Sequence, residues 1–189
     1  ECPTNELLEP KYTKNPKDRC FTCKQVLHSH LKVIAKEAGT SQVIDGVNHD
    51  DLDDHRPGIQ AAKKAGVLSP LAILRISKAN IRKISWALGF PWWDKPAQPC
   101  LASRFPYGEI ITAQKMEKVA KAEAWLKTNG ALAVRVRSQG LAARIELQND
   151  QIDQWIKNIN RDEIVAYFIS LGFTSVSLDL EGLISGKLN

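Results

Sequence analysis

Apolar residues recur at helical spacing in the first half of the chain, and polar turns separate the apolar stretches. The predicted elements of this half are helices over residues 18–38, 56–65 and 77–88 and a short strand over residues 41–45. Asp18 and Ser77 are suitable N-cap residues, and Gly39 is a suitable stop after the first helix. The strand runs directly into a polar turn, so its carboxyl end is a candidate edge for ligand binding.

After Gly108 the pattern changes to one strong helix followed by alternating strands and short helices. The predicted elements are a helix over residues 112–129, a hairpin of strands 131–137 and 141–147, helices over residues 150–159 and 161–171, and a strand over residues 174–180. In the last strand Val176, Leu178 and Leu180 alternate and are expected to face inward. The change of pattern predicts an α/β domain over residues 1–108 and a small α+β domain over residues 109–189.

The composition of the 189 residues, 43% hydrophobic and 25% charged, is that of an ordinary globular protein. No apolar run approaches the roughly 20 residues of a membrane span, and no signal peptide is visible, so the cytoplasm is the expected compartment. In that compartment the four cysteines are expected to be free thiols, ligands or catalytic groups. The net charge of +5 favours anionic partners such as nucleotides, phosphorylated cofactors or RNA.

Residues 95–108 form a loop that contains three prolines and one glycine, which excludes an ordinary helix or central strand. The loop holds the Cys100 thiol, the Ser103 hydroxyl and the Arg104 guanidinium close together in sequence. A nearby arginine favours the thiolate, the form of cysteine that attacks and ligates. The alternative is a buried linker in which Cys100 acts as a small apolar residue.

Cys20 and Cys23 lie three apart in the first turns of the first predicted helix, and therefore on one face. The helix dipole and the neighbouring cations favour thiolates there. This is the geometry of a chelating or redox pair, and a purely structural pair is the alternative. His28 and His30 could add ligands, but solvent exposure is the expected state of both histidines.

Asp45, Gly46 and Asn48 lie at the carboxyl end of the predicted strand, where ligands bind in open α/β sheets. Four aspartates follow closely and could indicate a cation site: Asp50, Asp51, Asp53 and Asp54. Their spacing matches no calcium loop, so a solvated acidic loop with helix capping is the favoured interpretation.

Arg135 and Arg137 alternate with valines on a predicted strand and therefore project from the same face. Two guanidiniums one period apart can bind a phosphate or carboxylate as a fork. Arg144 lies on the partner strand. The alternative is that these arginines pair with Glu146 or Asp179.

Four motifs taken together resemble one family over nearly the whole chain. They are Asn15-Pro-x-x-Arg-Cys-x-x-Cys-Lys, Asp45-Gly-x-Asn-x-Asp-Asp-x-x-Asp-x-Arg-Pro-Gly, Pro99-Cys-Leu-Ala-Ser-Arg-Phe-Pro-Tyr-Gly, and Val134-Arg-Val-Arg with Ala143-Arg-Ile-Glu. In these the sequence resembles the LarE-type sulfur transferases of the PP-loop ATP pyrophosphatase superfamily. The resemblance implies a partial PP-loop parallel-sheet domain that carries the cysteines, followed by a domain for substrate binding and oligomerisation.

The resemblance implies a reaction in nickel-pincer nucleotide cofactor biosynthesis, the maturation of lactate racemase. ATP with Mg²⁺ adenylates a carboxylate of pyridinium biscarboxylic acid mononucleotide, and a sulfur nucleophile then displaces AMP to leave a thiocarboxylate. It implies catalytic roles for Cys100 and Glu123. The residues implied to bind the adenylate and the substrate phosphate are Asp45, Gly46, Asn48, Arg56, Ser103, Arg104, Arg135 and Arg137.

The three cysteines Cys20, Cys23 and Cys100 resemble the branch of the family in which a [4Fe-4S] cluster carries an extra sulfide. In the single-cysteine branch, a cysteine at the position of Cys100 gives up its own sulfur and becomes dehydroalanine. Two other sites stay open on the residues alone: a Cys20–Cys23 redox pair, and a zinc site completed by a histidine such as His28.

The phosphate loop Ser-Gly-Gly-x-Asp-Ser of the superfamily is absent from these 189 residues, which contain no Gly-Gly. The chain therefore resembles the later two thirds of such an enzyme, and we expect residues 1–189 alone to release no pyrophosphate from ATP. The alternatives are a tRNA thiolation enzyme of the same superfamily and a non-catalytic cofactor-binding fragment. Nucleic acid is the less expected partner, since no dense basic stripe with interleaved exposed aromatics is visible. The resemblance also implies a homo-oligomer, with a hexamer as one form.

Overall fold

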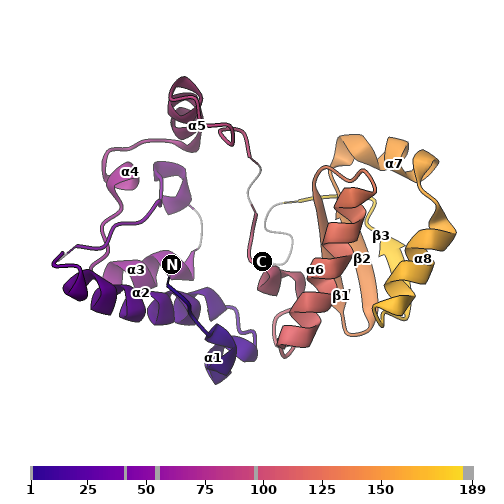
Figure 1. Ribbon diagram of the computed structural model, residues 1–189, viewed down its shortest axis with the longest axis horizontal. Helices are drawn as coiled ribbons and strands as arrows, with labels where there is room; N and C mark the ends of the chain where they lie inside the picture. Colours follow the sequence, from indigo (N-terminus) through magenta and orange to yellow (C-terminus); the bar gives the residue numbers. More distant parts are fainter. Residues whose placement is uncertain (1, 41, 54–55, 96–97, 185–189) are drawn as a thin grey trace. The chain divides into compact units, whose positions relative to one another are not determined.

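The computed structural model describes residues 2–40, 42–53, 56–95 and 98–184 and divides the chain into two compact units, 1–97 and 98–189 (Figure 1). The division falls earlier than the boundary at residue 108 that the change of pattern predicts. The reason is that residues 98–108 pack with the second unit: Ala102 and Phe105 are almost fully buried, and Arg104 pairs with Glu123. The Cys100 loop therefore belongs to the second unit.

The first unit is built from helices. Its elements are the 3₁₀ helices η1 (Glu6–Leu8) and η2 (His49–Leu52) and the α-helices α1 (Pro10–Thr13), α2 (Arg19–Glu37), α3 (Pro57–Lys64), α4 (Pro70–Ile73) and α5 (Lys78–Ala87). Helices α2 and α3 pack against each other, and Ala61 and Ala62 of α3 are buried. Gly58 eases this close approach, because a Cβ at that position would lie 3.1 Å from Cγ of Lys24 on α2, which is a tight contact.

The predicted strand over residues 41–45 is reduced to one parallel bridge between Ile44 and Leu68. Asp45 N–H donates to the Leu68 carbonyl oxygen and Leu68 N–H donates to that of Val43, at 2.9 and 3.0 Å. Among the described residues of the first unit there is no longer strand, so the parallel sheet that the resemblance implies is not formed there. An isolated pair of short strands is marginal without further partners.

The second unit carries a three-stranded mixed sheet with helices. Its elements are η3 (Leu101–Arg104), α6 (Ala113–Thr128), β1 (Val134–Gln139), β2 (Ala142–Leu147), η4 (Asn149–Gln151), α7 (Ile152–Asn158), α8 (Arg161–Ser170) and β3 (Ser175–Leu178). The order is β1-β2-β3: β2 pairs antiparallel with β1 and parallel with β3 (Figure 1). The parallel pairing requires the crossover that α7 and α8 provide.

The core of the second unit lies between the apolar face of the sheet and its helices. The fully buried side chains include Val119 and Leu126 of α6, Val136 and Ile145 of the sheet, and Phe168 of α8. Phe168 packs on Phe173 at a ring distance of 5.6 Å. The prediction that Leu180 faces inward is wrong: β3 ends at Leu178, and Leu180 is 81% exposed.

Candidate functional site

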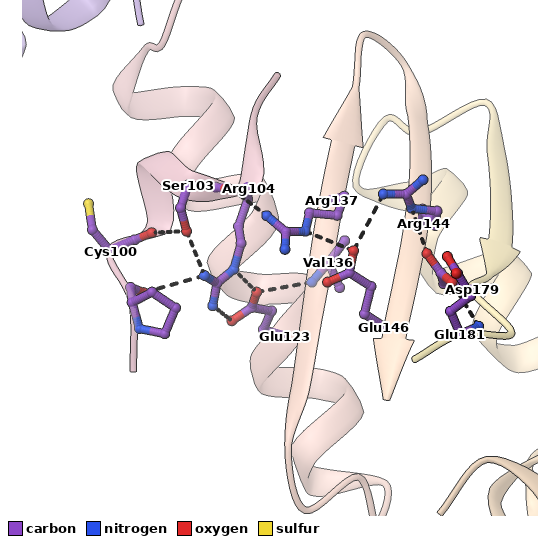
Figure 2. Close-up of polar contacts among 11 residues, drawn as sticks. Cys100, Ser103, Arg104, Glu123, Val136, Arg137, Arg144, Glu146, Asp179 and Glu181 are labelled. Atoms are coloured by element: carbon purple, nitrogen blue, oxygen red, sulfur yellow. Dashed lines mark hydrogen bonds and ion pairs between the residues drawn. The ribbon is translucent and has the colours of Figure 1, made fainter. Parts of the chain in front are cut away.

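The backbone around Cys100 is held in shape by the Ser103 hydroxyl and the Arg104 guanidinium of the same loop. Ser103 Oγ donates to the Cys100 carbonyl oxygen at 2.7 Å, and Arg104 donates to Ser103 Oγ and to the Pro99 carbonyl oxygen. These bonds fix the backbone on both sides of Cys100. The Cys100 side chain is exposed and points away from the polar contacts behind it (Figure 2).

Arg104 and Glu123 form a buried bidentate ion pair at the edge of the sheet (Figure 2). Arg104 Nε donates to Glu123 Oε1 at 2.6 Å, and its second amine donates to Oε2 at 3.1 Å. Glu123 Oε1 also accepts from Val136 N–H at 3.0 Å, which satisfies a backbone donor on the edge strand β1. Both oxygens of Glu123 are therefore engaged in holding η3, α6 and β1 together.

Arg137 pairs with Glu146 across the β1–β2 ladder, as the alternative interpretation of the arginines proposed. Arg137 Nε donates to Glu146 Oε1 at 2.9 Å, and its NH1 donates to the Ser103 carbonyl oxygen at 2.6 Å. Arg144 lies 3.4 Å from the same Glu146 oxygen and 3.2 Å from Asp179 Oδ2. The two arginines thus flank one carboxylate, and the pairs lie in the protein interior, since Arg137 and Glu146 are buried.

Arg135 is a cation of this face for which the described residues provide no ion-pair partner. We call the paired groups the arginine–carboxylate network; they are Arg104, Glu123, Arg137, Glu146, Arg144 and Asp179. Arg135 is half-buried, lies opposite Glu146 in the strand register, and forms no ion pair with any residue that the structure describes. With Arg135 included, the face carries four guanidiniums against three carboxylates.

The electrostatic surroundings of Arg135 favour a bound anion. Burial lowers the pKa of Arg135, and the charges of Arg104 and Arg137 lower the pKa further, while Glu146 and Glu123 act in the opposite direction. A guanidinium stays protonated in proteins, so Arg135 stays positively charged although it is partly buried and lies near two other cations. A phosphate or carboxylate at this position would relieve the repulsion and accept its hydrogen bonds.

Cys20 and Cys23 lie in the first two turns of α2, as predicted. They belong to the first unit, whereas Cys100 belongs to the second. Cys20 is exposed and Cys23 is half-buried, with its thiol donating to Glu6 Oε1 at 3.7 Å. Arg19, at the start of the helix, is buried and donates to Asn15 Oδ1. All four cysteines are thiols and none is half of a disulfide. Among the described residues no group of three or more His, Cys, Asp or Glu side chains gathers within one site.

The strand-end residues of the first unit are engaged in local turns. Asp45 Oδ1 accepts from Val47 N–H at 3.1 Å, and Asn48 forms a capping box with Asp51 at the start of η2. Arg56 pairs with Asp51 at 2.7 Å. Gly46 lies between Asp45 and Val47 with open space at its Cα.

In the described part of the acidic loop, two aspartates cap helices, as the favoured interpretation of this loop expects. Asp50 Oδ2 accepts from Lys78 N–H at 2.9 Å at the start of α5, and Asp51 closes the capping box. Asp54 lies outside the described residues. Asp50 and Asp51 therefore act as helix-capping groups.

One feature of the described residues was not predicted from the sequence. His28 was expected to be exposed to solvent but is 3% exposed, and neither of its ring nitrogens is hydrogen-bonded within the described part of the chain. Helical spacing alone did not indicate that this histidine is buried.

Three curated proteins are similar to the chain, while no protein-family model matches it. The uncharacterized protein slr1717 of Synechocystis is 56% identical over 186 residues, which covers 98% of the chain and 69% of that protein. The pyridinium-3,5-bisthiocarboxylic acid mononucleotide synthase of Lactiplantibacillus plantarum is 36% identical over 183 residues, or 97% of the chain and 66% of the synthase. The uncharacterized protein MJ0830 of Methanocaldococcus jannaschii is 32% identical over 172 residues, or 90% of the chain and 66% of that protein.

The chain thus spans about two thirds of the length of each of these relatives. Within the described residues, no helix is long and apolar enough to cross a bilayer.

Proposed function

Because the chain belongs to the LarE-like family, we propose that the protein which contains it is a sulfur transferase acting on a pyridinium mononucleotide. The observation that carries this proposal is the half-buried, uncompensated Arg135 beside the loop that presents Cys100. The L. plantarum relative is named as the synthase of a pyridinium mononucleotide that carries two thiocarboxylic acid groups. Its substrate chemistry, a phosphate and carboxylates on one small molecule, suits a site with an excess guanidinium.

The phosphate of the mononucleotide binds Arg135 in this proposal. Arg104 and Arg137 lie close enough to lower the pKa of Arg135, so they add positive potential at the same place while keeping their own carboxylate partners. Ser103 contributes a hydroxyl beside them. Glu123 acts as a positioning residue: it holds Arg104 and β1 together, and so orients the cations toward the phosphate.

The proposed reaction has two steps, adenylation of a carboxylate and displacement of AMP by sulfur. The carboxylate oxygen attacks the α-phosphorus of ATP, pyrophosphate leaves with Mg²⁺, and an acyl adenylate forms. A sulfur nucleophile then attacks the acyl carbon, the bond to the adenylate oxygen breaks, and AMP leaves with the electron pair. The product is a thiocarboxylate. The adenylate is proposed to lie against Asp45, Gly46, Asn48 and Arg56 of the first unit.

The donor set of the chain fits an iron–sulfur cluster in kind and number. Cys20 and Cys100 are exposed, Cys23 is half-buried, and none of the three is in a disulfide. We propose that Cys20, Cys23 and Cys100 would hold a [4Fe-4S] cluster, which would supply the sulfide for transfer. Cys20 and Cys23 provide two thiolates from one helix face, and Cys100 provides the third from its fixed loop.

The experiment that tests the function is a product assay on the full-length protein. The protein, reconstituted anaerobically with iron and sulfide, is incubated with pyridinium biscarboxylic acid mononucleotide, ATP and Mg²⁺, and the products are separated by mass. We expect a product in which sulfur replaces one carboxylate oxygen, formed only when ATP is present. Cys100→Ala should abolish this product and Cys2→Ala should leave it unchanged.

Formation of AMP without any sulfur-containing product in the wild-type protein would refute sulfur transfer. Equal product from Cys100→Ala and wild type would remove Cys100 from the reaction.

A further inference from the structure

A row of basic residues follows one side of α2, and three of its members, His28, Lys32 and Lys36, line a groove that the proposed function does not use. Lys24, His28, Lys32 and Lys36 are spaced four residues apart, so neighbouring members are about 6 Å apart along the helix and the row is about 18 Å long. Glu37 is the one acidic residue of α2. This basic row, as we call these four residues, is therefore not balanced by acids of its own helix.

The groove beside the row consists of two hollows that share Lys32. The first, of about 220 Å³, lies between α2 and α3 and is lined by His28, Lys32 and Lys64 with small side chains such as Ser29 and Ala61. The second, of about 390 Å³, continues past Lys32 to Lys36 and Gly39. Neither hollow is lined by an acidic or an aromatic residue.

The lysines of the basic row, and Lys64 on the opposite side of the groove, have no acidic partners in the described chain. Lys24, Lys32, Lys36 and Lys64 form no ion pair with any described residue; Lys64 Nζ lies over the Phe21 ring, 5.1 Å from its centroid. Like charges four apart on a helix repel each other and disfavour it. An anion in the groove would turn this repulsion into attraction.

His28 gives a second, independent sign of a ligand. The side chain is 3% exposed, lines the first hollow, and has no hydrogen-bond partner on either ring nitrogen within the described residues. Burial lowers the pKa of His28, Lys24 lowers the pKa further, Asp45 raises it, and Lys32 lowers it. A buried polar group without a partner costs free energy, which an anionic ligand and its bound water can recover.

We propose that this groove is a second anion site, for a short chain of phosphate groups bound by charge alone. Its length and its successive lysines fit a diphosphate or triphosphate better than one phosphate ion. Because no aromatic side chain lines it, nothing is present for a base to stack on, and the phosphate chain is the recognised part. The inference does not depend on the proposed sulfur transfer, which uses other residues.

The test is isothermal titration calorimetry of the 189-residue chain with inorganic triphosphate. The buffer contains neither phosphate nor Mg²⁺, and the titration is repeated at two salt concentrations. We expect binding that weakens as salt rises. The double variant Lys32→Gln/Lys36→Gln should weaken binding at least about tenfold, because each charge-assisted contact contributes on the order of a tenfold change in affinity. The matched control Lys83→Gln/Lys157→Gln removes the same charge from exposed positions and should change affinity less than about twofold.

ATP and a single-stranded RNA oligonucleotide distinguish the possible sources of the phosphates. ATP should bind within a few-fold of triphosphate if the base is not recognised. Affinity for ATP more than about tenfold above that for triphosphate would overturn the proposal, since it would show recognition of the base. Much tighter binding of RNA than of triphosphate would also overturn it in favour of a polynucleotide surface. Equal triphosphate affinity in the two double variants would show that the groove is not the site.

Discussion

Arg135 and Arg137 lie two residues apart on β1 and differ in what neutralises their charge. Arg137 is 4% exposed and is held by Glu146 and by the Ser103 carbonyl oxygen. Arg135 is half-buried, and no ion pair with a described residue neutralises it. The two arginines of the predicted fork therefore have separate tasks: one holds the network together and the other is left for a ligand.

Substitution of these two arginines should separate stability from affinity. Arg137→Ala leaves Glu146 buried with only Arg144, so we expect a loss of about 3 kcal/mol in the free energy of unfolding, measured in urea. Arg135→Ala should change that free energy by less than about 0.5 kcal/mol. It should weaken binding of the pyridinium mononucleotide by about tenfold, because one charge-assisted contact is lost.

The exposed Arg161 provides the matched control, since Arg161→Ala should change neither quantity. Unchanged mononucleotide affinity in Arg135→Ala would show that Arg135 does not bind the phosphate. A fully stable Arg137→Ala protein would contradict the structural task given to Arg137.

At this scale, spacing predicted which residues share a face but not which are paired. The alternation Val134-Arg135-Val136-Arg137 places both guanidiniums on one side of β1, as expected. The partner of each depends on β2, on η3 and on α6, which are distant in sequence.

Helices were predicted well because their ends carry local signals. α2 (Arg19–Glu37), α5 (Lys78–Ala87) and α6 (Ala113–Thr128) begin and end within two residues of the predicted positions. The Ser77 hydroxyl accepts the N-cap hydrogen bond that the sequence indicated, and the Thr112 hydroxyl accepts a similar bond at the start of α6. Asp18 stands at the N-cap position of α2 as predicted, but its side chain forms no capping hydrogen bond. The pairing of strands depends on distant segments, so the parallel pairing of β2 with β3 could not be read from the hydrophobic pattern.

The buried imidazole of α2 should make the stability of the first unit depend on pH. The pKa of His28 is lowered from its ordinary value of 6.5 by burial and by Lys24 and Lys32, against the opposite effect of Asp45. Below about pH 6.5 the unfolded chain therefore binds a proton that the folded chain does not bind. The unfolded state then binds more protons, so stability falls as the pH falls through this range.

The measurement is the urea midpoint of unfolding between about pH 7.5 and about pH 5.5 in phosphate-free buffer. The wild-type midpoint should fall more steeply with decreasing pH than that of His28→Gln. His30→Gln, which replaces an exposed histidine of the same helix, should behave as wild type. Parallel decline of the wild-type and His28→Gln proteins would show that His28 does not cause the pH dependence.

Across the whole molecule, the residues proposed for sulfur transfer come from both units. Cys20, Cys23 and the Asp45 turn belong to residues 1–97, while Cys100, Glu123 and the arginines belong to residues 98–189. The motifs were visible in the sequence because each is local. The complete set of contacts around each motif was not visible, since the arginine–carboxylate network joins η3, α6, the strands β1 and β2, and Asp179, which follows β3. The proposed function requires the cysteines of both units to act on one cluster.

The iron content of reconstituted protein shows whether the three cysteines share one cluster. The wild-type protein, Cys100→Ser and the matched control Cys2→Ser are treated anaerobically with iron and sulfide, desalted, and analysed for iron per chain and for absorbance in the visible range. We expect about four iron atoms per chain in the wild-type and Cys2→Ser proteins, and a large loss in Cys100→Ser. If Cys100→Ser holds as much iron as wild type, or if the wild-type protein binds only colourless zinc, the three cysteines do not form the proposed cluster.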